Sequence, residues 1–361
     1  MRIAIIGAGI VGLTAAAGLS RLGLRPEVFE KAPADTVAGA GISLFPSARK
    51  AFARLGLAEG YDSLPHGPAA DLRTAMRRPD GSIRFAFPAA VRPDVRMHHR
   101  EELRDFLLAE CAGVRFHWGT RATVLDDGGP LRRAELATDP GGTSQWDLIL
   151  AADGLRSPTR TMLGLDPGLR YTGYSAWRGV TAAAMGTQGT AGEDWGDGQR
   201  FGTVPLGDGR VYWFAVTSSQ EGRTATTRGF GSEREAALAE FQDWYPTARG
   251  LIAGTEPGAV LRHDLYDLRE PLNRFHRGRV ALLGDAAHAM TPDLGRGAGT
   301  GLDDAAELVG LLRASGAGDP DGETVNRILS RYSQRRAPRA ARMLLASRWM
   351  GRLAQRRRGD R

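Results

Sequence analysis

Three glycines and one carboxylate near the N-terminus have the residue types and the spacing that bind a dinucleotide. Gly7, Gly9 and Gly12 follow the apolar run at residues 3–6, and Glu30 ends the next apolar run. Gly7 permits a tight strand-to-helix turn, Gly9 lets the backbone approach a pyrophosphate, and Gly12 lets the helix pack close to the strand. The Glu30 carboxylate could accept both ribose hydroxyls. This motif predicts a bound dinucleotide but does not distinguish NAD from FAD.

A second glycine–acid pair, Gly284-Asp285, separates these two cofactors. It follows the apolar run VALL and precedes a stretch of small residues and a helix. Asp285 is suited to hydrogen-bond a ribityl hydroxyl, which FAD has and NAD lacks, and a simple helix cap is the alternative. The next segment, TPDLGRGAG, could turn its backbone N–H groups toward the isoalloxazine edge that becomes negative on reduction. The sequence therefore predicts FAD.

A third signal, Asp153-Gly154 in AADGLRSPTR, lies between these two motifs along the chain. In this order the motifs resemble those of class A flavoprotein monooxygenases, the para-hydroxybenzoate hydroxylase family, over nearly the whole length. The resemblance implies that Asp153-Gly154 serves FAD and NAD(P)H together, and that Arg100 contacts the flavin nucleotide. The expected cofactor-binding residues are Gly7, Gly9, Gly12, Glu30, Lys31, Arg100, Asp153, Gly154, Gly284, Asp285, Pro292, Gly295, Gly297 and Ala298.

The loop expected beside the flavin ring departs from the family pattern. Members often read P-N-L-G-Q-G there, whereas this chain reads P-D-L-G-R-G from Pro292 to Gly297. The arginine in place of glutamine, Arg296, could stabilise an anionic flavin or substrate, or could point to solvent. The sequence leaves these alternatives open.

The predicted substrate residues lie on a hairpin, QRFGTVPLGDGRVYWFAV. A register centred on its GDG turn would pair Val204 with Tyr212 and Arg200 with Val216. Because strand side chains alternate between faces, Arg200, Tyr212 and Phe214 would then share one face. The resemblance is to the urate-hydroxylase and salicylate-hydroxylase-like subgroup, whose urate-hydroxylase-like members carry a substrate-site Arg and Tyr at this spacing. Arg200 and Tyr212 are therefore the predicted catalytic residues, and a structural Arg beside an aromatic sheet residue is an equal alternative.

The elements that must position these residues follow from periodicity. RIAIIG and EVFEK read as parallel strands around a helix, and residues 71–87 alternate around a Pro-Asp-Gly turn as a hairpin does. VRFHWGTRATVLDD and RRAELATDPGGTSQWDLILAADG read as strands returning to the same sheet, whereas residues 171–267 read as a separate antiparallel layer with one helix near 233–244. We predict an α/β fold: a split Rossmann-like FAD-binding domain (1–70, 96–165 and 276–318), an inserted, mostly antiparallel β-sheet substrate-binding domain (71–95 and 166–275), and a C-terminal helix (319–361).

Composition narrows the class of protein. The 361 residues carry a formal net charge of +7, and this charge is scattered except in the basic stretch at 352–361, so we expect no nucleic-acid partner. Cys111 is the only cysteine, which excludes an intrachain disulfide and predicts a buried, inert thiol in a cytoplasmic protein. The uncharged residues 3–20 are read as the nucleotide turn and not as a membrane span. We expect no metal, because no His, Cys or acidic cluster has ligand spacing.

The resemblance also implies a reaction. NAD(P)H reduces FAD, O2 adds to form a C4a-hydroperoxide, and one oxygen atom passes to a small aromatic or heteroaromatic substrate. The sequence has no second complete dinucleotide turn, so NADH or NADPH is expected to bind transiently. An FAD-dependent oxidase or reductase without oxygen insertion and a non-catalytic flavoprotein are the alternatives. A flavin halogenase would need a W-x-W-x-I-P motif and a catalytic lysine, neither of which is evident. The oligomeric state is not indicated.

Overall fold

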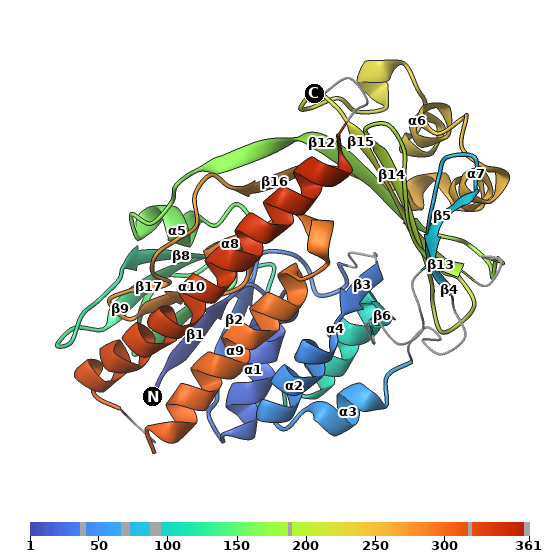
Figure 1. Ribbon diagram of the computed structural model, residues 1–361. Coiled ribbons are helices and arrows are strands. Elements are labelled where there is room, and N and C mark those ends of the chain that lie inside the picture. Colours follow the sequence, from blue (N-terminus) through green and yellow to red (C-terminus); the bar gives the residue numbers. More distant parts are fainter. Residues whose placement is uncertain (37–40, 66–72, 87–94, 187–189, 317–319, 357–361) are drawn as a thin grey trace.

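The computed structural model describes residues 1–36, 41–65, 73–86, 95–186, 190–316 and 320–356. The chain has two halves: one is an α/β unit with a mostly parallel sheet, and the other is built on a mostly antiparallel sheet. The long helix α10 (Gly322–Ala354) runs from the first half toward the second (Figure 1). This arrangement confirms the predicted fold class. The predicted domain limits at 70/71 and 318/319, and the last five residues of the basic stretch, lie outside the described residues.

The first half is organised by a six-stranded sheet in which all neighbours are parallel except one edge pair. Every residue of β1 and β11 is buried, as expected for parallel strands covered on both faces. The strands in spatial order are β17 (His276–Arg277), β18 (Val280–Leu282), β11 (Leu148–Ala151), β1 (Ile3–Ile6), β2 (Glu27–Glu30) and β7 (Arg115–Trp118).

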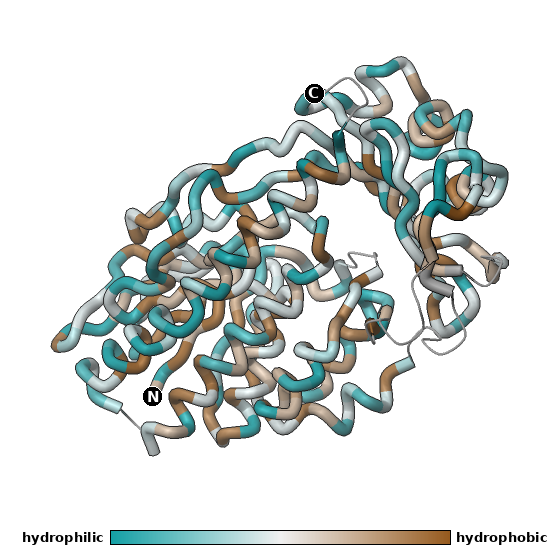
Figure 2. The backbone as a smooth tube through the Cα atoms, viewed as in Figure 1, coloured by the Kyte–Doolittle hydropathy of each residue, from teal (hydrophilic) through white to brown (hydrophobic). Residues whose placement is uncertain are grey.

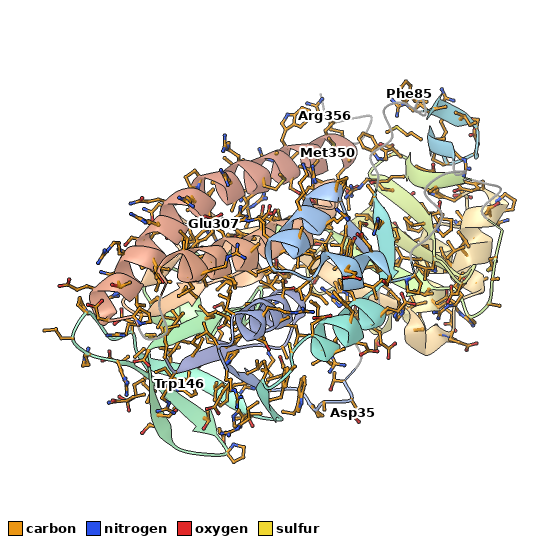
Figure 3. All side chains as sticks on the ribbon, turned by 90° about the horizontal axis from the view of Figure 1, so that it is seen from below. Asp35, Phe85, Trp146, Glu307, Met350 and Arg356 are labelled. Carbon is orange, nitrogen blue, oxygen red and sulfur yellow. The ribbon has the colours of Figure 1, made fainter. Side chains whose placement is uncertain are left out.

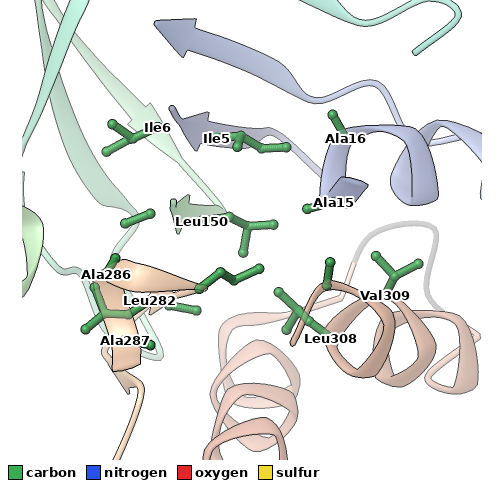
Figure 4. Packing of buried hydrophobic residues seen from close by; sticks show 14 of the residues in the cluster. Ile5, Ile6, Ala15, Ala16, Leu150, Leu282, Ala286, Ala287, Leu308 and Val309 are labelled. Carbon is green, nitrogen blue, oxygen red and sulfur yellow. The ribbon is translucent and has the colours of Figure 1, made fainter. Parts of the chain in front are cut away.

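Helices cover this sheet through small and branched apolar residues. In Figure 4, Ala15 and Ala16 of α1 (Ile10–Arg21) and Leu308 of α9 (Gly297–Ala314) lie on the same side of the strand residue Leu150. All four side chains are fully buried, and the alanines allow helix and sheet to approach closely. The remaining helices of this half are α2 (Pro46–Arg54), α3 (Ala58–Asp62), α4 (Arg100–Ala109), α5 (Pro158–Met162) and α8 (Asp285–His288).

One predicted set of strands does not return to the main sheet. β8 (Arg121–Asp126), β9 (Ala134–Asp139) and β10 (Thr143–Trp146) form a separate three-stranded antiparallel sheet, so that prediction was wrong for them. The burial of β8 alternates between exposed and buried residues, which suits a sheet with one solvated face. Two further strands, β3 (Gly41–Leu44) and β6 (Arg96–His99), pair antiparallel as a separate two-stranded sheet.

The second half is a seven-stranded sheet, antiparallel except where β13 meets β4. Its outer face packs on α6 (Glu233–Glu240) and α7 (Pro246–Ala253) through Trp177, Phe201, Trp213 and Phe241. The sequence indicated one helix in this region, and the structure has two. The strands in spatial order are β16 (Leu261–Leu268), β12 (Leu169–Val180), β15 (Val211–Ser218), β14 (Gln199–Pro205), β13 (Thr190–Trp195), β4 (Arg73–Arg77) and β5 (Ile83–Ala86).

Helix α10 connects the two halves. Hydrophilic and hydrophobic residues alternate along it (Figure 2), as expected for a helix with one buried side. Near its middle Arg335 binds Glu307 of α9, and Glu307, which is labelled in Figure 3, also binds Arg54 of α2. Beyond its end Gln355 donates to the Gly198 carbonyl of the second half. None of the helices that the structure describes is long and apolar enough to cross a membrane, and no metal-binding group of His, Cys, Asp or Glu occurs in that part of the chain.

The single thiol, Cys111, is buried, and its Sγ–H donates to the Leu13 carbonyl at 3.7 Å. Burial raises the pKa of Cys111 to about 12, and the neighbouring Glu110 adds to this effect. Because the thiolate is the reactive form, we expect iodoacetamide at pH 8 to leave the native protein unlabelled and to label it once in denaturant. Mass spectrometry distinguishes the two, and native labelling at the rate of free cysteine would contradict the prediction.

Candidate functional site

A cavity of about 650 Å³ lies between the two sheets and draws its walls from both. From the first half come the α1 N-terminus, the segment after β11, and the segment from Leu283 through the start of α9. From the second half come inward-facing residues of β12, β14, β15 and β16. A concave site of this size between two structural units is a common place for a cofactor and a substrate.

The first glycine turn has the close contacts that its spacing predicts. Gly7 has φ +100, a conformation that L side chains rarely adopt, and a Cβ there would lie 2.5 Å from the Ala152 carbonyl oxygen. A Cβ on Gly12 would lie 2.0 Å from the Gly7 carbonyl oxygen. Gly9 precedes α1 with no atom within 4 Å of its Cβ position, and it lines the cavity. The turn therefore leaves backbone N–H groups of a helix start open for a phosphate.

The acid after β2 is held by the backbone. Glu30 Oε2 accepts the Ala8 N–H at 2.8 Å, and Oε1 accepts the Ala32 N–H at 2.9 Å. Each carboxylate oxygen has more than one lone pair, so both can still accept a ribose hydroxyl. Neither Glu30 nor the adjacent exposed Lys31 lines the cavity.

The second motif presents an open carboxylate. Gly284, at φ +60, precedes the short helix α8, and its N–H donates to Asp304 Oδ2 at 3.0 Å. Asp285 begins α8, lines the cavity and is exposed to it, and it makes no side-chain capping bond. A group in this position is free to accept a hydroxyl hydrogen bond.

Asp153 has a buried carboxylate oxygen that shows whether the site suits a bound molecule with hydrogen-bond donors. Its Oδ2 accepts the Thr159 N–H at 3.2 Å, while its Oδ1 is buried and has no hydrogen-bond partner among the described residues. Buried acceptors are rarely left unpaired, so a donor from a bound molecule would satisfy this oxygen. Together with the glycine turn and the open Asp285, this residue fits a hydroxyl-rich dinucleotide.

The loop after α8 reaches the cavity as expected. Pro292, Gly295, Gly297 and Ala298 all line it, together with Asp293. Arg296 takes a place that the sequence did not indicate. Its guanidinium lies over the Phe45 ring, 4.1 Å from the centroid, and donates to Ser47 Oγ at 3.3 Å.

The predicted hairpin register is confirmed. Val204 pairs with Tyr212 and Arg200 with Val216, as the turn-centred register required. Arg200, Tyr212 and Phe214 line the cavity together from this face. Burial raises the pKa of Tyr212, against the opposing effect of the nearby cations Arg178 and Arg100.

Arg200 lies in a buried network of charged and polar groups. Its guanidinium donates to Glu193 Oε1 at 3.0 Å, to Asp293 Oδ1 at 2.7 Å and to Gln355 Oε1 at 2.8 Å. Tyr174 donates its hydroxyl to the other Asp293 oxygen at 2.6 Å. Two carboxylates therefore balance the charge of Arg200, whose side chain is 3% exposed.

Sequence reasoning missed Glu193, Gln355 and Tyr174 as members of this network. The available signal was the acidic residue Asp293 in the loop after α8, because a buried carboxylate needs a cationic partner. Burial raises the pKa of Glu193, and Arg200 opposes that change.

Of the remaining motif residues, Arg100 lines the cavity, and His98 and His288 do not. Arg100 begins α4 and lines the cavity, where burial lowers its pKa and Asp285 acts in the opposite direction. His98 is fully buried against Pro65 and Tyr61 and lies in the core. His288 is also buried, and its Nε2 bonds Asp304 at 2.6 Å, which agrees with a packing role.

Several known proteins are similar to this chain in sequence and in fold. A family model described as an FAD binding domain matches residues 1–347. The aurachin C monooxygenase/isomerase of Stigmatella aurantiaca is 33% identical over 362 residues, which are 98% of this chain and 90% of that protein. An FAD-dependent urate hydroxylase of Klebsiella oxytoca is 32% identical, over 96% of this chain and 89% of its own. The structure of Klebsiella pneumoniae HpxO complexed with FAD and uric acid gives a TM-score of 0.82 at 29% identity, covering 100% of this chain and 90% of HpxO.

Proposed function

The chain belongs to the family of FAD-dependent aromatic hydroxylases, and from this premise we propose that it is an NADH- or NADPH-dependent monooxygenase. It inserts one oxygen atom from O2 into a small aromatic or heteroaromatic molecule. The observation that carries this proposal is the shared cavity: FAD-type motifs form one wall, and an aromatic sheet face forms the other.

The residues present fit FAD. The α1 start with Gly9 would hold the pyrophosphate, Glu30 the adenosine ribose, and Asp285 the ribityl chain, while Asp153 would receive a donor at its unpaired oxygen. The loop with Pro292, Gly295, Gly297 and Ala298 would border the ring, and Lys31, Arg100, Gly154 and the turn glycines complete the proposed set. The chemistry that FAD supplies when bound is acceptance of a hydride from NAD(P)H and transfer of one oxygen atom to a ring.

The chain's own contribution is positioning and water exclusion. Phe214 and Val216 give the substrate ring an apolar surface, and the Tyr212 hydroxyl can orient a ring oxygen. The Arg200 guanidinium holds Asp293, and so the loop beside the ring, in a fixed place. Arg200 therefore acts as a positioning residue, and Tyr212 is the proposed catalytic residue that touches substrate. Because the described residues supply no second glycine turn, we propose that the nicotinamide cofactor binds transiently.

The names of the relatives support oxygen insertion over the alternatives. One is a monooxygenase and isomerase that acts on aurachin C, and another hydroxylates urate. An oxidase or reductase without insertion stays the second candidate, because it would use the same FAD-binding wall.

The test is NAD(P)H consumption by the purified yellow protein with a panel of phenols, purines and quinolones. We expect at least one compound to raise NADH or NADPH oxidation about tenfold and to gain about 16 mass units under ordinary O2 and about 18 under 18O2. Apoprotein stripped of flavin is the matched control. Stimulated oxidation that yields only hydrogen peroxide would favour the oxidase, and protein that takes up no FAD would refute the proposal.

A further inference from the structure

One cation on the substrate wall of the cavity is not accounted for by the proposed function. Arg178 lies on β12 between two neighbours in register, Phe214 of β15 and Leu261 of β16. All three line the cavity, and Ala176 and Val216 continue the same face. The two adjacent strands therefore place an aromatic and an aliphatic side chain on either side of Arg178, and an aromatic ring packs on this kind of surface.

Arg178 differs from Arg200 and Arg262 in having no ion-pair partner among the residues that the structure describes. Arg200 binds Glu193 and Asp293, and Arg262 on the next strand binds Asp264 at 2.9 Å. By contrast, half-buried Arg178 makes no hydrogen bond or ion pair with any residue that the structure describes. A partly buried guanidinium loses hydration without replacing it, so a ligand with a matching anionic group would recover that loss.

The neighbouring titratable groups leave this position positive. Arg100 and Arg178 lie close enough that Arg178, after burial, contributes to lowering the pKa of Arg100. His263, on β16 beside Arg178, has its pKa lowered by burial and then by these arginines, so it is neutral at pH 7. Two carboxylates lie in this part of the cavity. Asp285 acts on Arg100, and Asp264 is already bound by Arg262 and Ser175.

We propose that Arg178 binds an anionic oxygen of the substrate, a carboxylate or an ionised ring hydroxyl, while the ring lies on the apolar sheet face beside Phe214. This inference rests on the proposed function and names the class of substrate: an acidic aromatic or heteroaromatic molecule. The Tyr212 hydroxyl, which lines the same face, would donate to the same oxygen or its neighbour. A phosphate of NADPH is a second source of the same anionic chemistry, and the apolar neighbours favour the substrate.

The experiment measures binding, so it does not depend on turnover. Isothermal titration calorimetry on the FAD-loaded protein compares 1-hydroxy-2-naphthoate with 1-hydroxy-2-naphthamide, which has the same rings and no carboxylate charge. We expect the wild type to bind the acid about tenfold more tightly, the size of one charge-assisted contact. Arg178→Met keeps the aliphatic length and should remove this preference while binding the amide as before.

The matched control is Arg115→Met, which removes one positive charge from β7 of the other sheet, where the Arg115 side chain is 73% exposed. It should keep the preference for the acid. Equal binding of acid and amide by the wild type, or an undiminished preference in Arg178→Met, would overturn the inference. So would a loss of NADP⁺ affinity in Arg178→Met with unchanged naphthoate binding, because the anion would then belong to the nicotinamide cofactor. Failure of the proposed function would show separately, as absent NAD(P)H oxidation by protein whose calorimetry follows the expected pattern.

Discussion

Replacing Gly12 with alanine is expected to weaken FAD binding about 100-fold and to destabilise the fold by about 1–3 kcal/mol. The new Cβ would lie 2.0 Å from the Gly7 carbonyl oxygen and 3.4 Å from the Ala152 Cβ. The nearest of these atoms is backbone, so no side chain can rotate away from the methyl group. Gly7 cannot easily move either, because its own Cβ position is already 2.5 Å from the Ala152 carbonyl oxygen. The turn must open, and the N–H groups proposed for the pyrophosphate move with it.

The matched control is Gly310→Ala in α9, another helical glycine, whose Cβ would meet only the Arg54 Nη2 atom at 3.6 Å. Alanine there should stabilise the helix by about 0.8–1 kcal/mol. Flavin absorbance after gel filtration reports the bound cofactor, and urea unfolding reports stability. A Gly12→Ala protein as yellow and as stable as the wild type would disprove the role assigned to this turn.

Local patterns in the sequence were sufficient for much of the fold. The continuous apolar run at residues 3–6 predicted a central parallel strand, and the alternation around the GDG turn fixed the pairing of Arg200 with Val216. Both signals are short-range: one is the burial of a strand on both faces, and the other is the period of two along a hairpin. Helix α10 (Gly322–Ala354) likewise lies within the segment 319–361 that was predicted to form a C-terminal helix.

The errors arose where a pattern leaves the partner of an element open. The strands β8 and β9 were recognised as strands, but alternation alone does not say which sheet a strand joins. Arg200 was placed on the correct face, but its partners Glu193 and Gln355 lie 7 and 155 residues away and leave no local signature. The contact with Gln355 depends on where the end of α10 lies against the second sheet. The sequence therefore did not indicate that Glu193 and Asp293 neutralise Arg200, and for this reason it did not single out Arg178 as a substrate-binding cation.

The buried carboxylate of Asp304 in α9 makes the most consequential contacts that no sequence pattern indicated. It accepts His288 Nε2 at 2.6 Å, the Gly284 N–H at 3.0 Å and Arg336 Nε at 2.7 Å. All of these groups are buried, so the network ties α8, α9 and α10 to the glycine that precedes Asp285. Through Gly284, Asp304 acts as a positioning residue for the proposed ribityl contact.

We expect Asp304→Ala to lower the free energy of unfolding by about 3–5 kcal/mol, because it leaves the Arg336 charge buried without its partner. Burial raises the pKa of Asp304, but His288 and Arg336 lower it by more, so this pKa lies below its ordinary value. The stabilisation is therefore present above about pH 4 and is lost in the wild type as the pH falls through the folded-state pKa. Urea unfolding at pH 7 and in acid should show the variant and the wild type converging at low pH.

The control is the neighbouring Asp303→Ala. The Asp303 side chain is 35% exposed and lies 3.9 Å from Arg336, so this substitution should lower the free energy of unfolding by about 1 kcal/mol or less. A loss at pH 7 no larger than that of Asp303→Ala would show that Asp304 does not hold these helices together.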